Sequence, residues 1–221
     1  AQGKLVTNRA LMRDKFLAWC AQLPARCLIA MEASSGAHHW ARKLVCLGLQ
    51  ARIIAAHLVE PYRSQGKSGK NDANDAAAIC EAASRPSMRF VAIKTVDQQS
   101  MLSVHRLREG FKEERTAGTN RIRGLLAEFG VVIPQSTTVL RESLSEVIED
   151  ANNELSGLVR LVIERAQTQW KELDEHIDWC DQRIAAHLKN DAQARAAAQL
   201  IGVGPVSASA VVATGGDFKQ F

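Results

Sequence analysis

Three carboxylates of the chain have the spacing and the surroundings that a metal site requires. Asp72 and Asp75 stand three residues apart at the start of an alanine-rich segment, and residues at this spacing share one face of a helix. Glu32 ends an apolar segment that we expect to form a buried strand, and α/β sheets bind ligands at the carboxyl ends of their strands. Mg²⁺ is held by a few carboxylate oxygens together with substrate phosphates. The three acids therefore predict a Mg²⁺ or Mn²⁺ site for phosphodiester chemistry, in which metals activate the attacking oxygen and stabilise the leaving one.

The same two aspartates also suit a purely structural role. Asp72 is placed to cap a helix and Asp75 to lie in its first turn, where the helix dipole favours acidic side chains. A two-metal site normally has a fourth carboxylate. Asp14 falls within an expected helix and Glu60 precedes a proline, so neither is suitably placed. The local sequence leaves both interpretations open.

Two further segments carry groups that could hold a phosphate. Arg63, Lys67 and Lys70 belong to a basic, glycine-containing segment next to the aspartates, where a cationic side chain could touch a nucleic-acid backbone. Gly202 and Gly204 come just before a proline in a predicted tight turn between two helices. Free backbone N–H groups at such a helix start could hold a DNA phosphate.

A second basic cluster lies in a long segment with helical periodicity. It is interleaved with glutamates at spacings that form ion pairs along a helix. A nucleic-acid track and a solvated, salt-bridged helix face explain this pattern equally well. The cluster consists of Arg106, Arg108, Lys112, Arg115, Arg121 and Arg123.

The elements that must position these residues alternate at first and then become helical. Strands are expected over 4–8, 26–32 and 51–55, and helices over 9–22, 37–47 and 72–84. Such alternation implies a parallel or mixed sheet covered by helices. Over 96–129 and 140–187, apolar residues recur at helical spacing among many charges, which predicts long antiparallel helices or a dimerising coiled coil. We therefore divide the chain into an α/β domain (1–89), a helical region (90–190) and the start of a domain with a glycine hairpin (191–221).

Composition excludes several classes of protein. The apolar runs are too short to cross a bilayer, which predicts no membrane association. The five cysteines have neither CxxC pairs nor zinc-ligand spacing, so we expect free thiols in a reducing cytoplasm. The histidines, among them His105 and His187, show no ligand pattern and are expected to be structural or surface residues. A net charge of +4 allows a nucleic-acid partner without requiring one.

Nearly the whole chain resembles the DEDD transposases of the IS110 family of insertion sequences. These are recombinases that resemble Holliday-junction resolvases and are guided by a bridge RNA. The resemblance implies a ribonuclease-H-like (RuvC-like) mixed sheet with helices, followed by a long coiled-coil region and the start of a helix-hairpin-helix-like domain. The matching segments are 31–34 (MEAS), 38–41 (HHWA), 70–76 (KNDANDA), 85–91 (RPSMRFV) and 202–205 (GVGP).

The resemblance also implies roles for particular residues. The four acids of the family come in the order Asp, Glu, Asp, Asp, and the last three correspond to Glu32, Asp72 and Asp75, which are thereby expected to be catalytic residues and Mg²⁺ or Mn²⁺ ligands. For the basic residues and hairpin glycines above, the resemblance favours contact with DNA or a guide RNA. It further implies a homo-oligomer, dimer or tetramer, in the bacterial cytoplasm. The family's first aspartate is expected before Ala1 and its serine nucleophile beyond Phe221, so the chain alone is expected to be inactive.

Two alternatives to a transposase remain at this point. One is a nuclease resembling Holliday-junction resolvases, in which water replaces serine as the attacking group. The other is a non-enzymatic nucleic-acid-binding scaffold built on the long helices, in which the acids serve as helix caps.

Overall fold

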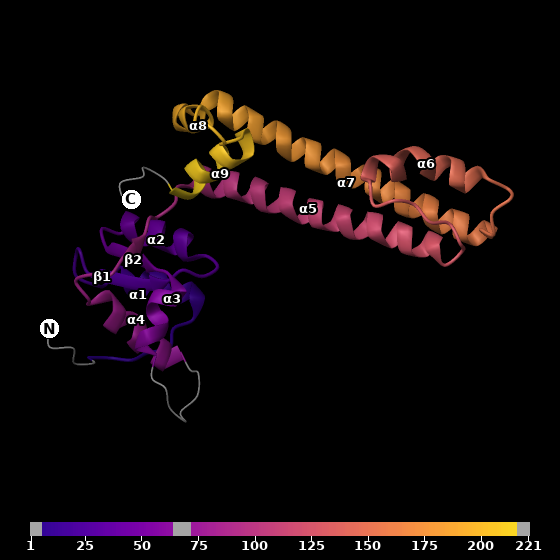
Figure 1. The fold of residues 1–221 in the computed structure, drawn as a ribbon. Coiled ribbons are helices and arrows are strands. Elements are labelled where there is room, and N and C mark those ends of the chain that lie inside the picture. The colour runs from indigo at the N-terminus through magenta and orange to yellow at the C-terminus, as the bar shows by residue number, and fades with distance from the viewer. Residues whose placement is uncertain (1–5, 64–71, 216–221) are drawn as a thin grey trace. The chain divides into compact units, whose positions relative to one another are not determined.

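The computed structural model describes residues 6–63 and 72–215, and its elements group into two compact units. Among the described residues, unit 1 contains 6–63, 72–96 and Gly215, and unit 2 contains Asp97–Thr214. Unit 1 is a mixed α/β structure and unit 2 is helical (Figure 1). The functional division into 1–89, 90–190 and 191–221 stays a prediction, because compactness alone does not assign a role to a segment.

Unit 1 is built on a small mixed sheet. Strand β1 (Leu28–Glu32) pairs in parallel with β2 (Gln50–Ile54), and β2 pairs antiparallel with the short β3 (Phe90–Val91). The strand order is β1-β2-β3. Helix α2 (Ala37–Cys46) connects the two parallel strands and ends before Gly48, whose φ of 76° is the left-handed conformation typical of a helix C-terminus.

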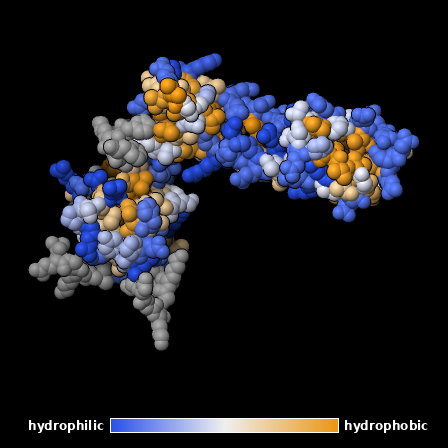
Figure 2. Space-filling model, in the orientation of Figure 1, coloured by the Kyte–Doolittle hydropathy of each residue, from blue (hydrophilic) through white to orange (hydrophobic). Residues whose placement is uncertain are grey.

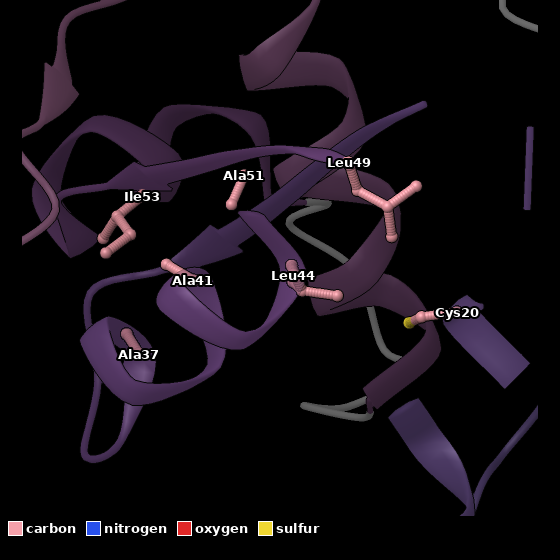
Figure 3. Close-up of a cluster of buried hydrophobic side chains, with 7 residues drawn as sticks. All are labelled: Cys20, Ala37, Ala41, Leu44, Leu49, Ala51 and Ile53. Carbon is pink, nitrogen blue, oxygen red and sulfur yellow. The ribbon is translucent and has the colours of Figure 1, made fainter. Parts of the chain in front are cut away.

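Helices cover both faces of this sheet. Ala37, Ala41 and Leu44 recur on one side of α2 and pack with Ile53 in a buried apolar cluster (Figure 3). The next residue of β2, Ile54, belongs instead to a cluster with helix α4 (Asp72–Ala83). Because successive strand residues point to opposite faces, α2 and α4 lie on opposite sides of the sheet. Between β2 and α4 the chain forms α3 (Ala56–Val59) and the 3₁₀ helix η2 (Glu60–Tyr62).

The N-terminal segment differs from the sequence-based expectation. Within the described residues, 6–12 adopt no regular structure, so the strand predicted over 4–8 is not formed there. Helical structure starts only with η1 (Arg13–Lys15) and continues in α1 (Phe16–Cys20), which is shorter than the helix predicted over 9–22. The physical reason is the lack of a packing surface, because Val6 is 94% exposed and Met12 is 71% exposed. A strand without a neighbouring strand leaves its backbone groups to water.

Unit 2 is dominated by two long antiparallel helices, α5 (Val96–Ala127) and α7 (Gly157–Asn190). Arg108 of α5 contacts Asp181 of α7, and Arg115 contacts Asp174, so the numbering runs in opposite directions along the pair. Where α5 ends and α7 begins, α6 (Thr137–Glu149) packs against both long helices. The buried side chains of this three-helix core are Ile122, Leu126, Leu140, Leu144, Leu155, Ile163 and Trp170.

The helix predicted over 140–187 is in fact two helices. The chain leaves α6 at Asp150 and starts α7 after Ser156, whose hydroxyl accepts a hydrogen bond from the Val159 N–H. Asn153 stabilises the intervening loop by donating to the Val147 carbonyl. The apolar periodicity of the sequence continues through this loop, but the Asn-containing turn interrupts the helical structure and the Ser156 cap starts a new helix.

Two short helices complete unit 2. They are α8 (Ala192–Ala198) and α9 (Pro205–Gly215), joined by a turn in which Gly202 has a φ of 83°. The predicted helix-to-helix turn is thus present.

At the end formed by α6 and the start of α7, hydrophobic side chains reach the surface (Figure 2), and Val139, Leu158 and Leu161 are exposed there. Within the described residues, no helix combines the length and apolarity that a membrane crossing needs.

Candidate metal and nucleic-acid site

Glu32 lies at the end of strand β1, just before the turn that leads into helix α2. It is the last residue of β1, opposite Ile54 of β2, and its side chain is 24% exposed. The following Ala33 N–H donates to the Ile54 carbonyl at 2.7 Å, which fixes the backbone at the end of the strand. The carboxylate is therefore presented at the carboxyl end of a parallel strand pair, the usual ligand-binding edge of such sheets.

Asp75 reaches the same edge from the first turn of α4. Ala78 and Ala82 of this helix are buried against the sheet, and Asp75 precedes Ala78 by three residues, so it lies on the same helix face. Its side chain is 28% exposed. Asp72, three residues earlier, is exposed at the start of the helix. The predicted pair is thus divided between a half-buried and an exposed carboxylate.

Arg63 joins Glu32 to Asp75. Its Nη2 atom donates to Glu32 Oε2 at 2.8 Å, and its Nε atom lies 3.1 Å from Asp75 Oδ1. The second contact is a close ion pair without hydrogen-bond direction, because the Nε–H of Arg63 is buried and has no hydrogen-bond partner. One guanidinium therefore lies between two carboxylates that are 43 residues apart in the sequence.

This arrangement fits a divalent cation in the chemistry of its donors. Carboxylate oxygens are the hard ligands that Mg²⁺ and Mn²⁺ prefer, and the Arg63 guanidinium shows that Glu32 and Asp75 can share one positive charge. In this conformation, however, the described residues contain no group of three His, Cys, Asp or Glu side chains that could hold a metal. Asp72 would have to join the pair to complete a three-carboxylate site. Lys67 and Lys70, which we predicted to contact phosphate nearby, lie outside the described residues.

A cavity of about 420 Å³ lies beside Glu32. Its lining combines apolar side chains of β1 with the ring of Trp40 and the cation of Arg13. The Arg13 guanidinium lies 5.3 Å from the centre of the Trp40 ring, a cation–π contact. The cavity gives the strand end an open side with both apolar and polar surface.

The arginines of α5 divide into paired and exposed residues. Arg108 donates to Asp181 at 2.6 Å, and this hydrogen bond raises the pKa of Arg108 above its ordinary value. Arg115 contacts Asp174 at 3.0 Å. Arg123 donates to the carbonyls of Pro134 and Gln135. These contacts support the structural interpretation for the three residues named.

Four other residues that we predicted to contact nucleic acid are open to solvent. Arg106 and Arg121 of α5 are exposed, and so are Gly202 and Gly204 of the turn before α9. Arg106 and Arg121 belong to unit 2, and the carboxylates belong to unit 1.

The structure contains a buried hydroxyl with two histidine partners, which the sequence did not predict. Ser209 of α9 is fully buried, and its Oγ lies 2.9 Å from His105 Nε2 of α5 and 3.0 Å from His187 Nδ1 of α7. His187 Nε2 in turn lies 3.8 Å from Asp191. The pKa of His105 is lowered, first by burial and then by the positive charges of Arg108 and His187. No short motif could have indicated this cluster, because His105 and Ser209 are 104 residues apart.

Comparison with known proteins gives consistent matches. A family model for transposases of the DEDD, IS110 type matches residues 1–131. The chain is 40% identical over 218 residues to a probable family 20 transposase of Pseudomonas aeruginosa, and the alignment covers 98% of this chain and 63% of that protein. It is 37% identical to the transposase for insertion sequence element IS1328 of Yersinia enterocolitica (99% and 64%) and 35% identical to that for IS1111A of Coxiella burnetii (99% and 59%). The chain therefore spans less than two thirds of these relatives' length. No solved structure gives a significant match.

Proposed function

Because the chain belongs to the DEDD transposases of the IS110 type, we propose that it supplies the metal-binding part of an enzyme that cuts and exchanges DNA strands during insertion-sequence transposition. Glu32, Asp72 and Asp75 are the proposed ligands of Mg²⁺ or Mn²⁺. The metal would polarise the scissile phosphate and stabilise the charge that develops on its oxygens.

The observation that carries this proposal is the convergence of Glu32 and Asp75 on one cation. A strand end and a helix start are brought together so that two half-buried carboxylates face the same positive group. Two buried or half-buried acids at one point repel each other unless a cation lies between them. A site that keeps such a pair at the ligand-binding edge of a sheet is suited to a divalent ion.

The residues of the chain have separate roles in this proposal. Glu32 and Asp75 provide ligands from rigid elements, and Asp72 adds a carboxylate from the exposed side, one helical turn away. Parallel pairing of β1 and β2 with helices on both faces supports a ribonuclease-H-like fold for unit 1. The exposed Arg106 and Arg121, the hairpin glycines and the segment with Lys67 and Lys70 are the proposed contacts to DNA or a guide RNA.

Calorimetric titration with Mg²⁺ and with Mn²⁺ tests the metal site. We expect binding by the wild-type chain and a loss of at least about tenfold in affinity in Glu32→Gln and in Asp75→Asn, because each variant removes one charged ligand. Glu81→Gln is the matched control, since Glu81 lies on α4 and pairs with Arg85. Equal affinities in the wild type and all three variants would contradict the proposal and favour a scaffold in which the acids are helix caps.

A further inference from the structure

We propose that Arg63 is an internal cation that holds the Glu32–Asp75 pair in the metal-free protein and is displaced when a divalent metal ion binds. This inference rests on the proposed metal site and adds a residue that controls its occupancy. Arg63 would thus set the metal concentration at which the site fills.

The position of Arg63 suits a side chain that can leave. It follows η2 immediately, in extended backbone conformation, and its side chain is 35% exposed. The Nε–H is buried without a hydrogen-bond partner, so one of its donors is unsatisfied in the observed position. A long side chain with an exposed path and an unsatisfied donor can move away from its partners at small cost.

Arg63 and a metal ion compete for the same oxygens. The guanidinium already contacts Glu32 Oε2 at 2.8 Å and lies 3.1 Å from Asp75 Oδ1. A divalent metal ion would take these same carboxylate oxygens as its ligands, and two cations in direct contact repel each other. The metal therefore binds only as Arg63 leaves the pair.

The strength of this competition follows from the exposure of the pair. Ion pairs that water can reach stabilise a protein only slightly, so the cost of breaking them during metal binding weakens the metal affinity of the wild type by a factor on the order of 5. A point charge of two units on the metal outcompetes one delocalised charge once its concentration is sufficient. After displacement, the planar guanidinium remains beside the site and is suited to a bidentate contact with a substrate phosphate.

The decisive measurement is Mn²⁺ and Mg²⁺ affinity by calorimetry at neutral pH for the wild type, Arg63→Gln, Arg63→Lys and the matched control Arg85→Gln. Arg85 lies in the same unit and pairs with Glu81, so its variant removes the same charge without touching the metal ligands. We expect Arg63→Gln to bind metal about fivefold more tightly than Arg85→Gln. Arg63→Lys is expected to lie between Arg63→Gln and the wild type, because an ammonium cannot bridge both carboxylates as a fork.

A second experiment observes Arg63 directly by NMR. It uses only the wild-type chain, so its result does not depend on whether a variant folds. In the wild-type chain, the Nε–H signal of Arg63 in an NMR spectrum should shift on addition of diamagnetic Mg²⁺, with the same half-saturation as the calorimetric signal. An unchanged signal at saturating Mg²⁺, or equal affinity in Arg63→Gln and Arg85→Gln, would overturn the inference. If the wild type and all arginine variants bind no metal, the metal site itself is wrong. Tight binding that depends on Glu32 but not on Arg63 would leave the site standing and remove only the displacement.

Discussion

The two units use contacts between arginine and carboxylate in different ways. In unit 2, Asp174 of α7 receives Arg115 from α5 and Arg141 from α6, so one carboxylate joins three helices. In unit 1, the relation is reversed, because Arg63 is one cation between two carboxylates. The first arrangement leaves a net positive charge among its three groups, and the second leaves a net negative charge.

This difference separates a structural contact from a candidate site. An aspartate with two arginines forms a cluster of net positive charge, which does not attract a further cation. A pair of carboxylates with one arginine still carries an excess negative charge, which favours a divalent ion in its place. The balance of charges in each cluster, rather than the presence of ion pairs, therefore indicates where chemistry can occur.

The largest effect is expected from the core of unit 2. Leu144→Ala removes a fully buried side chain from the cluster of α5, α6 and α7 and should lower the free energy of unfolding of unit 2 by about 2–5 kcal/mol. Denaturant unfolding followed by circular dichroism measures this change. Metal affinity in unit 1 should be unaffected. Leu161→Ala, at an exposed position of α7, is the control, and an equal loss in both variants would contradict the packing described.

Removal of the shared aspartate should have the next largest effect. Asp174→Ala leaves Arg115 and Arg141 without their common partner and should destabilise unit 2 by about 1–2 kcal/mol. Asp178→Ala, at an exposed position one turn later on the same helix, should change stability by less than about 0.5 kcal/mol. Thermal unfolding of both variants distinguishes them. A comparable effect of the two substitutions would mean that the triple contact contributes nothing.

Acid should destabilise unit 2 through His105. Burial lowers the pKa of His105 below its ordinary value of 6.5, so the unfolded chain binds the proton more readily than the folded one. Stability is then complete above about pH 6.5 and falls as the pH drops from there to the lower folded pKa, by at most about 1.4 kcal/mol per pH unit for one proton. Denaturant titrations at several pH values across this range give the free energy of unfolding, and its dependence on pH should be weaker in His105→Gln than in the wild type. An identical slope in the variant and the wild type would assign the dependence to other groups.

The smallest change in stability is expected at the exposed arginines of α5. Arg121→Gln should leave the free energy of unfolding within about 0.5 kcal/mol of the wild type. It should lower the slope of log affinity for nucleic acid against log salt concentration by about 1, the value expected for the loss of one phosphate contact. Arg115→Gln is the paired counterpart, since its partner is Asp174, and it should mainly lose stability. Binding measured by fluorescence anisotropy at several salt concentrations gives the slopes. No change in slope for Arg121→Gln would remove this residue from the proposed nucleic-acid contacts.

Local signals in the sequence predicted most of the regular elements. The apolar segment before Glu32, the glycine after α2 and the acids at the start of α4 each mark a boundary that depends only on neighbouring residues. The helices over 96–127 and 205–215 follow from the same kind of signal. Elsewhere the local signal was insufficient, because the segment over 6–12 has helical and strand-like residues but no surface to pack against.

The sequence by itself determined which residue types stand at the ends of the elements, and hence the family and the candidate carboxylates. Only the tertiary structure decided which charges meet. Arg63 meets Glu32 from 31 residues away, and His105 meets Ser209 from 104 residues away. Such contacts depend on how sheets and helices pack over long separations, which no local spacing specifies. The physical reason is that helices and caps are stabilised between near neighbours, whereas a site is made where distant elements converge.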